Sequence, residues 1–144
     1  MVRMVDIGHK KAVSRMARAS GFILLKKETL KKIESKDVPK GDVFAVAQIA
    51  AILAVKKTTD LVPLTHPISI TGTDVDIKLE KDGVRVEVEV RSTSQTGVEM
   101  EALSGVSGAL LTIWDMVKGL EKDEKGQYPT TLIRDIHVIK KVKG

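Results

Sequence analysis

Residues 84–91 constrain the fold most strongly, because apolar and charged side chains alternate there without a break. The alternating residues are Val84, Arg85, Val86, Glu87, Val88, Glu89, Val90 and Arg91. A period of two places every valine on one face of a β-strand and every charge on the other. The stretch therefore predicts a sheet with one dry face.

The segments around this strand predict an α+β fold. Further strands are expected at 21–27, 68–80 and 130–141, where 68–80 and 84–91 form a hairpin about residues 81–83. Helices are expected at 28–35, at 42–57 with Asp42 as the N-cap, and at 96–118. The order is β-α-β-β-α-β, which is the ferredoxin-like arrangement of an antiparallel sheet with helices packed on one face.

Length and composition point to one domain over residues 1–144, of which 1–19 form a basic, partly irregular N-terminal arm. Residues 58–67 hold two prolines and are expected to be a loop. The chain has 42% hydrophobic and 30% charged residues, which is typical of a globular protein. It has no cysteine, which excludes disulfides and thiolate sites, and nothing indicates export, so a cytoplasmic location is predicted. The net charge of +5 suits an anionic ligand.

The long helix over 96–118 carries acidic residues near both of its ends. Counting 100° per residue, one narrow stripe contains Glu101, Gly105, Gly108, Thr112 and Asp115. Fourteen helical residues span roughly 21 Å, so Glu101 and Asp115 cannot reach one small reacting centre from one straight helix. They serve two ends of a large ligand, or two sites shared between subunits. The alternative is an amphipathic core helix with solvated ends.

Several polar residues are candidates for a site, and each also has a structural interpretation. Lys40 lies where a loop meets a helix N-terminus, which would attract phosphate, or it is a solvated lysine beside a simple cap. His66 is held between two prolines, but a lone histidine is more often structural than catalytic. Glu99 could simply be an acidic residue that the helix dipole stabilises at the helix N-terminus. Asp115 and Lys118 could form a surface pair or, if buried, a proton-transfer couple.

The remaining patterns limit the kind of ligand. His9, His66 and His137 share no ligand spacing, so no protein metal site is expected, although Mg²⁺ could accompany the phosphates of a ligand. An RNA-binding module would need aromatic residues on its sheet, but aromatics are 3% of the chain and the hairpin strands contain none. A ligand-binding oligomer without chemistry stays open. The residues alone predict an oligomeric protein that binds an anionic metabolite.

Four blocks together carry a family resemblance: KGDVFAVAQIA, DLVPLTHP, TGVEMEAL and IWDMVK. In this order and spacing they resemble cyclic pyranopterin monophosphate synthase, the protein C family of molybdenum cofactor biosynthesis, from residue 4 to the last strand. The resemblance implies an enzyme that converts 3',8-cyclo-7,8-dihydroguanosine 5'-triphosphate into cyclic pyranopterin monophosphate and pyrophosphate by acid/base chemistry. It also implies a ferredoxin-like fold, no redox cofactor, and a hexamer built as a trimer of dimers with active sites at the dimer interface.

The same resemblance assigns roles to individual residues. It implies Asp115 as the catalytic acid/base with Lys118 and Lys40 as its partners in proton transfer. It implies a substrate site formed by Leu64, Thr65, His66, Glu99, Met100 and Glu101, with Arg15 and Lys141 near the triphosphate. The chain departs from the family pattern at Thr65, where cysteine is common, and in its short tail, Val142 to Gly144. Covalent chemistry is therefore not expected at Thr65.

Overall fold

The computed structural model describes all residues 1–144. The elements in chain order are β1 Val13–Leu24, α1 Lys27–Glu34, α2 Val43–Lys56, α3 Thr58–Leu61, β2 Ile70–Leu79, β3 Gly83–Ser94, α4 Glu99–Glu121 and β4 Leu132–Lys143. The four strands form one antiparallel sheet in the order β2-β3-β1-β4. Apart from the short α3, this is the predicted ferredoxin-like arrangement, which is confirmed.

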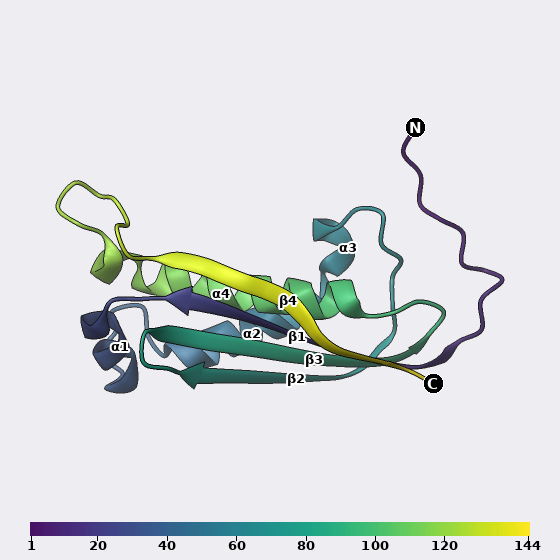
Figure 1. Ribbon diagram of the computed structural model, residues 1–144, viewed down its shortest axis with the longest axis horizontal. Helices are drawn as coiled ribbons and strands as arrows, with labels where there is room; N and C mark the ends of the chain where they lie inside the picture. The colour runs from purple at the N-terminus through teal and green to yellow at the C-terminus, as the bar shows by residue number, and fades with distance from the viewer.

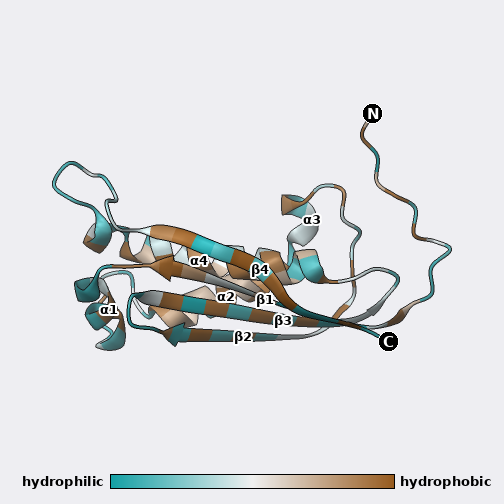
Figure 2. Ribbon diagram, viewed as in Figure 1, coloured by the Kyte–Doolittle hydropathy of each residue, from teal (hydrophilic) through white to brown (hydrophobic).

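One face of the sheet is covered by α2 and α4, and the other is open (Figure 1). The four alternating valines of β3 are fully buried against these helices. Figure 2 shows the same alternation as brown and teal segments along β3. The predicted single dry face is therefore confirmed. No helix is long and apolar enough to cross a membrane.

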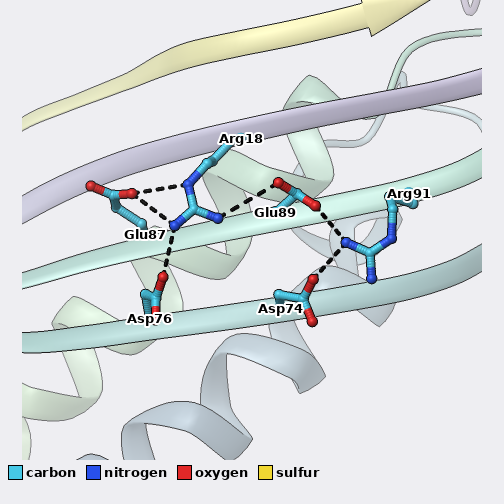
Figure 3. A network of polar contacts seen from close by, with 6 residues as sticks. All are labelled: Arg18, Asp74, Asp76, Glu87, Glu89 and Arg91. Carbon is cyan, nitrogen blue, oxygen red and sulfur yellow. Dashed lines mark hydrogen bonds and ion pairs between the residues drawn. The ribbon is translucent and has the colours of Figure 1, made fainter.

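The open face carries a network of cross-strand ion pairs, drawn in Figure 3. The shortest contacts are Arg18–Asp76 at 2.8 Å, Arg18–Glu87 at 2.9 Å, Arg91–Asp74 at 2.6 Å and Arg91–Glu89 at 2.5 Å. Each arginine lies between carboxylates of two strands, which supports the register of β1, β2 and β3. These cations are already paired within the sheet, so the basic groups of the candidate site must come from elsewhere.

Two glycines bring α4 close to α2. A Cβ atom at Gly105 would lie 2.9 Å from Val55 Cγ2, and one at Gly108 would lie 2.7 Å from the Ala54 Cβ. Both distances are too short for an unchanged packing of the two helices, so only glycine fits here. The small residues in the middle of the stripe therefore serve helix packing, while its acidic ends remain for other roles.

The far end of α4 is fixed by a buried carboxylate. Glu121 is fully buried and accepts hydrogen bonds from the Thr29 hydroxyl, the Thr131 hydroxyl at 2.6 Å and the Lys26 backbone N–H at 3.1 Å. A buried carboxylate is tolerated when its oxygens are satisfied in this way. Glu121 thus joins α4 to the start of α1 and to the segment that leads into β4.

Several predicted boundaries were wrong, and among them α4 begins at Glu99 rather than at residue 96. β1 begins at Val13 rather than after residue 19, so the arm ends at residue 12. Arg15, Ala17 and Ala19 alternate into the buried face, and this mixture of arginine and alanine hides the alternation in the sequence. The predicted loop 58–67 begins with the single helical turn α3, and α4 continues three residues past 118 to Glu121.

Candidate active site at the start of helix α4

A pocket of about 190 Å³ lies where the loop after α3 meets the first turn of α4. It is lined by Leu64, Thr65, His66, Ile68, Thr96, Gly97, Glu99, Met100 and Glu101. Six of these were predicted from the sequence, and the structure brings both predicted stretches together. Ile68, Thr96 and Gly97 were missed, although Thr96 and Gly97 immediately precede the acidic turn.

Local hydrogen bonds shape the loop side of this pocket. The Thr65 hydroxyl donates to the Val62 carbonyl oxygen at 2.7 Å, and the Thr65 backbone N–H donates to the same oxygen at 3.2 Å. The flanking Pro63 and Pro67 restrict the backbone further. Thr65 therefore holds the turn.

The helix side of the pocket presents two carboxyl groups in different surroundings. Glu101 is 4% exposed, and none of the ion pairs in the structure includes it. Burial raises the pKa of Glu101, and the nearby Glu99 carboxylate raises it further. The Glu99 side chain is 29% exposed and lies 3.6 Å from Lys141 Nζ. The pocket thus combines a charge-paired carboxylate with a buried carboxyl that has no cation.

Two predicted basic residues, Arg15 and Lys141, lie at different depths around the pocket. Lys141 comes from β4 and reaches Glu99, as just described, so it stands beside the lining residues. Arg15 is buried beneath them, where its Nε donates to the Ser94 carbonyl at 3.0 Å and its Nη2 donates to the Gln95 carbonyl at 3.4 Å. Arg15 therefore supports the turn that leads into the pocket, and it does not line the cavity.

A larger cavity adjoins the pocket across His66. It measures about 470 Å³ and lies between the N-terminal arm, residues 4–8, and the side chains of His66, Pro67 and Gln95. The Gln95 Nε2 amide donates to the Lys10 carbonyl at 3.1 Å, which ties the arm to the turn before α4. The space available to a ligand therefore continues from the pocket toward the arm.

The three predicted proton-transfer residues, Lys40, Asp115 and Lys118, form a separate cluster. Lys40 Nζ lies 3.0 Å from Asp115 Oδ2 and donates to the Asp115 carbonyl oxygen at 3.0 Å, while Lys118 Nζ lies 3.6 Å from Asp115 Oδ1. The hydrogen bond and the charge of Lys40 lower the pKa of Asp115, with a smaller effect from Lys118. The Asp115 side chain is 60% exposed. The cluster is thus an open, cationic patch around one carboxylate.

The pocket and the cluster lie at opposite ends of α4. In Figure 1, α4 begins beside α3 and ends at the α1 end of the molecule. The 14-residue separation of Glu101 and Asp115 corresponds to roughly 21 Å of helix. Within one chain the two groups therefore cannot act on the same atom, as the sequence spacing predicts.

Neither the pocket nor the cluster of Lys40, Asp115 and Lys118 has the set of ligands that a resident metal ion needs. No set of three or more histidine, aspartate or glutamate side chains in the structure is placed to hold a metal ion, and the chain has no cysteine. The acidic residues of the pocket face a single histidine and a lysine. This donor set suits hydrogen bonds to an organic ligand better than metal coordination.

Comparisons with known proteins agree with this geometry. The model of the MoaC family matches residues 4–144. The chain belongs to the MoaC family. Relatives named "Probable cyclic pyranopterin monophosphate synthase" include those of Methanosarcina acetivorans, at 61% identity over 99% of this chain and 90% of the relative, and Archaeoglobus fulgidus, at 57% over 99% and 92%. The relative from Pyrococcus furiosus is 58% identical over 99% of this chain and 91% of its own length.

Membership of the MoaC family confirms the resemblance found in the sequence blocks. The match covers both the pocket and the lysine–aspartate cluster, because both lie within residues 4–144. Relatives of almost the same length carry the name of an enzyme in this family, so the prediction of an enzyme is confirmed. An RNA-binding module finds no support in these relatives.

Proposed function

We propose that this chain is a cyclic pyranopterin monophosphate synthase that acts by general acid/base catalysis. It converts 3',8-cyclo-7,8-dihydroguanosine 5'-triphosphate into cyclic pyranopterin monophosphate and pyrophosphate, in the biosynthesis of the molybdenum cofactor. The observation that carries this proposal is the pocket that Glu99, the buried Glu101 and His66 line together. The names of the family relatives support the choice of reaction.

The pocket suits the base-derived part of such a substrate. The Glu99 carboxylate can accept hydrogen bonds from the adjacent N–H groups on the edge of a guanine-type ring, while the buried Glu101 lines the same pocket. Leu64 and Met100 add apolar contact surface, and both are partly exposed at the mouth. A nucleoside triphosphate exceeds a pocket of about 190 Å³, so its remainder extends beyond the pocket. His66 lines both the pocket and the larger cavity, and Lys141 is paired with Glu99 beside the pocket.

A second copy of the chain would supply the other half of the site. The Lys40, Asp115 and Lys118 cluster is solvent-facing in one chain and lies too far along α4 to reach its own pocket. We therefore place this cluster against the pocket of a partner chain, where Asp115 exchanges protons and the two lysines stabilise negative charge. This arrangement keeps the predicted roles of all three residues.

The outer face of α2 supports such an assembly. Val46, Ile49 and Leu53 recur at helical spacing and are 41%, 67% and 55% exposed. A row of large apolar side chains on one helix face is typical of a surface that a partner covers. A homo-oligomer buries this row, and the hexamer built as a trimer of dimers, with sites at the dimer interface, is the arrangement we propose. The cytoplasmic location stays a prediction from the sequence.

The proposed reaction needs proton transfers and a stabilised pyrophosphate leaving group, so we assign no redox cofactor. Mg²⁺ enters, if at all, with the phosphates of the substrate. Besides further copies of the chain, the partner we propose is the small-molecule nucleotide, with no nucleic acid and no membrane.

Pyrophosphate release from the purified protein tests the proposal directly. Incubation with the cyclised nucleotide should yield pyrophosphate and cyclic pyranopterin monophosphate in equal amounts, whereas GTP in a parallel incubation should yield neither. Binding of the cyclised nucleotide without any pyrophosphate release would contradict the enzyme and favour the ligand-binding oligomer. The two outcomes separate the proposed synthase from the alternative that the sequence left open.

A further inference from the structure

The two carboxyl groups of the pocket differ in a way that assigns them different tasks. Glu99 is partly exposed and charge-paired with Lys141, whereas Glu101 is almost fully buried and has no cation within ion-pair distance. Titratable pairs whose surroundings differ this much divide into a charged partner and a proton carrier. The two groups are only two residues apart on one helix, so the difference between their surroundings comes from packing.

A second cavity lies behind Glu101. It measures about 90 Å³ and is lined by Val55, Lys56, Thr58, Thr59, Pro67, Ile68, Ile70 and Glu101. Glu101 and Ile68 line both this back cavity and the pocket, so they form the partition between the two. A water needs about 10–15 Å³ of such space together with polar partners, so the back cavity has room for water. The Glu101 side chain therefore borders the substrate space and a small space of its own.

The polar groups of the back cavity suit proton exchange with water. The Thr58 hydroxyl already donates to the carbonyl oxygens of Ala54 and Val55, at 3.1 and 2.9 Å. Thr59 and Lys56 supply the other polar lining. The charged and titratable groups around Glu101 are thus Glu99 from α4, His66 from the loop after α3, Lys56 from α2 and, through Glu99, Lys141 from β4.

We propose that Glu101 carries a proton in the resting site, donates it to a ring nitrogen of the bound substrate, and recovers it through the back cavity. The O–H bond of Glu101 breaks as the N–H bond forms on the nitrogen that leaves when the purine-derived ring opens. The electron pair of the breaking C–N bond stays on that nitrogen, the lone pair of the other nitrogen on the same carbon forms a C=N bond, and Glu101 becomes a carboxylate. A proton from solvent, passed by water in the back cavity, restores the acid. This inference rests on the proposed function and adds a catalytic residue to it.

Matched variants of the two glutamates test the proposal. Glu101→Gln keeps the side-chain shape and can still form hydrogen bonds, but its amide cannot transfer a proton to the substrate as a carboxylic acid does. The kcat should therefore fall by about 10²–10⁴-fold with only a small change in KM. The wild-type kcat should decline toward high pH as Glu101 loses its proton, and the variant should lack that decline. Glu99→Gln should instead raise KM and keep the decline. A Glu101→Gln enzyme with nearly normal kcat, or with a raised KM alone, would overturn the assignment.

A measurement without turnover separates this inference from the proposed function. Carbon-13 NMR of side-chain-labelled glutamate, in the ligand-free oligomer, should show a carboxyl that titrates above the ordinary value of about 4.3 and that is absent from Glu101→Gln. That signal is expected even if the protein releases no pyrophosphate, in which case the proposed function fails and the protonated Glu101 stands. A Glu101 signal that titrates at the ordinary value would show that Glu101 is not the proposed proton donor.

The back cavity is tested by filling it. Thr59→Leu places extra carbon atoms where Thr59 now lines the cavity, so proton return should slow and kcat should fall while nucleotide affinity is kept. Thermal unfolding of the variant shows whether the fold is intact. Unchanged kcat in a folded Thr59→Leu protein would show that Glu101 recovers its proton from the pocket side, and the back-cavity route would be wrong.

Discussion

The two ends of α4 place carboxyl groups in opposite environments. At the start, Glu101 is buried against the loop after α3 and its pKa is raised by burial. Near the end, Asp115 is exposed beside Lys40 and Lys118, and its pKa is lowered chiefly by Lys40. One helix thus carries one carboxyl whose pKa is raised and one whose pKa is lowered. The sequence shows only that both residues are acidic. Their different packing in the fold is what shifts their pKa values in opposite directions.

The contrast also explains why one chain contains two half-sites. The buried end offers hydrogen-bonding groups and a pocket, but none of the residues that line this pocket is a lysine or arginine, and Lys141 beside it is paired with Glu99. The exposed end offers two lysines around one carboxylate but no enclosed space. Binding a ring and moving protons on it requires both, so we infer that an oligomer joins the buried end of one α4 to the exposed end of another.

The largest expected effect comes from removing the charge at the exposed end. Asp115→Asn keeps the side-chain shape but cannot ionise, so turnover should fall by roughly 10²–10⁴-fold. Nucleotide affinity should survive, because the pocket residues at the other end are unchanged. Pyrophosphate release and nucleotide binding, measured on the same preparation, check both statements. Near-normal turnover would reduce Asp115 to a surface ion pair.

Mixing inactive variants tests whether the two ends meet across chains. Asp115→Ala and Glu101→Ala proteins should each be inactive, but dissociation and joint reassembly should restore intact sites in mixed dimers. Random pairing in two-fold symmetric dimers gives about a quarter of all sites an unaltered pair of ends. Activity after mixing, compared with each variant reassembled alone, measures this recovery. If the mixed and reassembled variants recover no activity, this result would count against sites that are shared between subunits.

The sequence predicted the fold from patterns that local physics fixes. Alternation along β3, the Asp42 side chain that accepts a hydrogen bond from the Ala45 N–H at 3.1 Å, and the apolar periodicity of α4 all have the structure expected of them. The start of β1 could not be predicted in this way, because a buried Arg15 has the appearance of a surface residue until its carbonyl partners on the neighbouring strand are known.

The site was predictable by segment but not by geometry. The loop containing His66 and the turn containing Glu99 were both proposed, and their meeting in one pocket follows from the antiparallel sheet that brings both to one end. Residue type alone cannot tell which carboxyl is buried, since Glu99 and Glu101 are both glutamates, two positions apart. Thr96 and Gly97 could have been found as the residues just before the first turn of α4, whereas Ile68 has no chemical signal.

The same substitution at two glycines should separate the packed part of α4 from the open part. Gly105→Ala places a methyl group within 3.0 Å of Val55 and Val88 side-chain atoms, so it should destabilise the fold by about 1–3 kcal/mol. Gly119→Ala meets no atom within 4 Å and should stabilise it by about 0.5–1 kcal/mol through the higher helix propensity of alanine. Denaturant unfolding of both variants checks the opposite signs. Equal effects would mean that α4 and α2 are not closely packed at Gly105.

The smallest expected effects concern the pH dependence of stability at the two ends. Because the folded-state pKa of Glu101 is raised, its contribution is complete below the unfolded value of about 4.3 and is lost as the pH rises through the folded pKa. Glu101→Gln should therefore unfold at a higher temperature than the wild type at neutral pH and lose this advantage in acid.

Because the pKa of Asp115 is lowered, its contribution is present above the unfolded value of about 3.9 and is lost as the pH falls through the folded pKa. Asp115→Asn should show the reverse sign, with a lower unfolding temperature at neutral pH and no difference in strong acid. Thermal unfolding of the three proteins across this pH range measures both differences, and two variants that shift in the same direction would show that the ends of α4 are electrostatically alike.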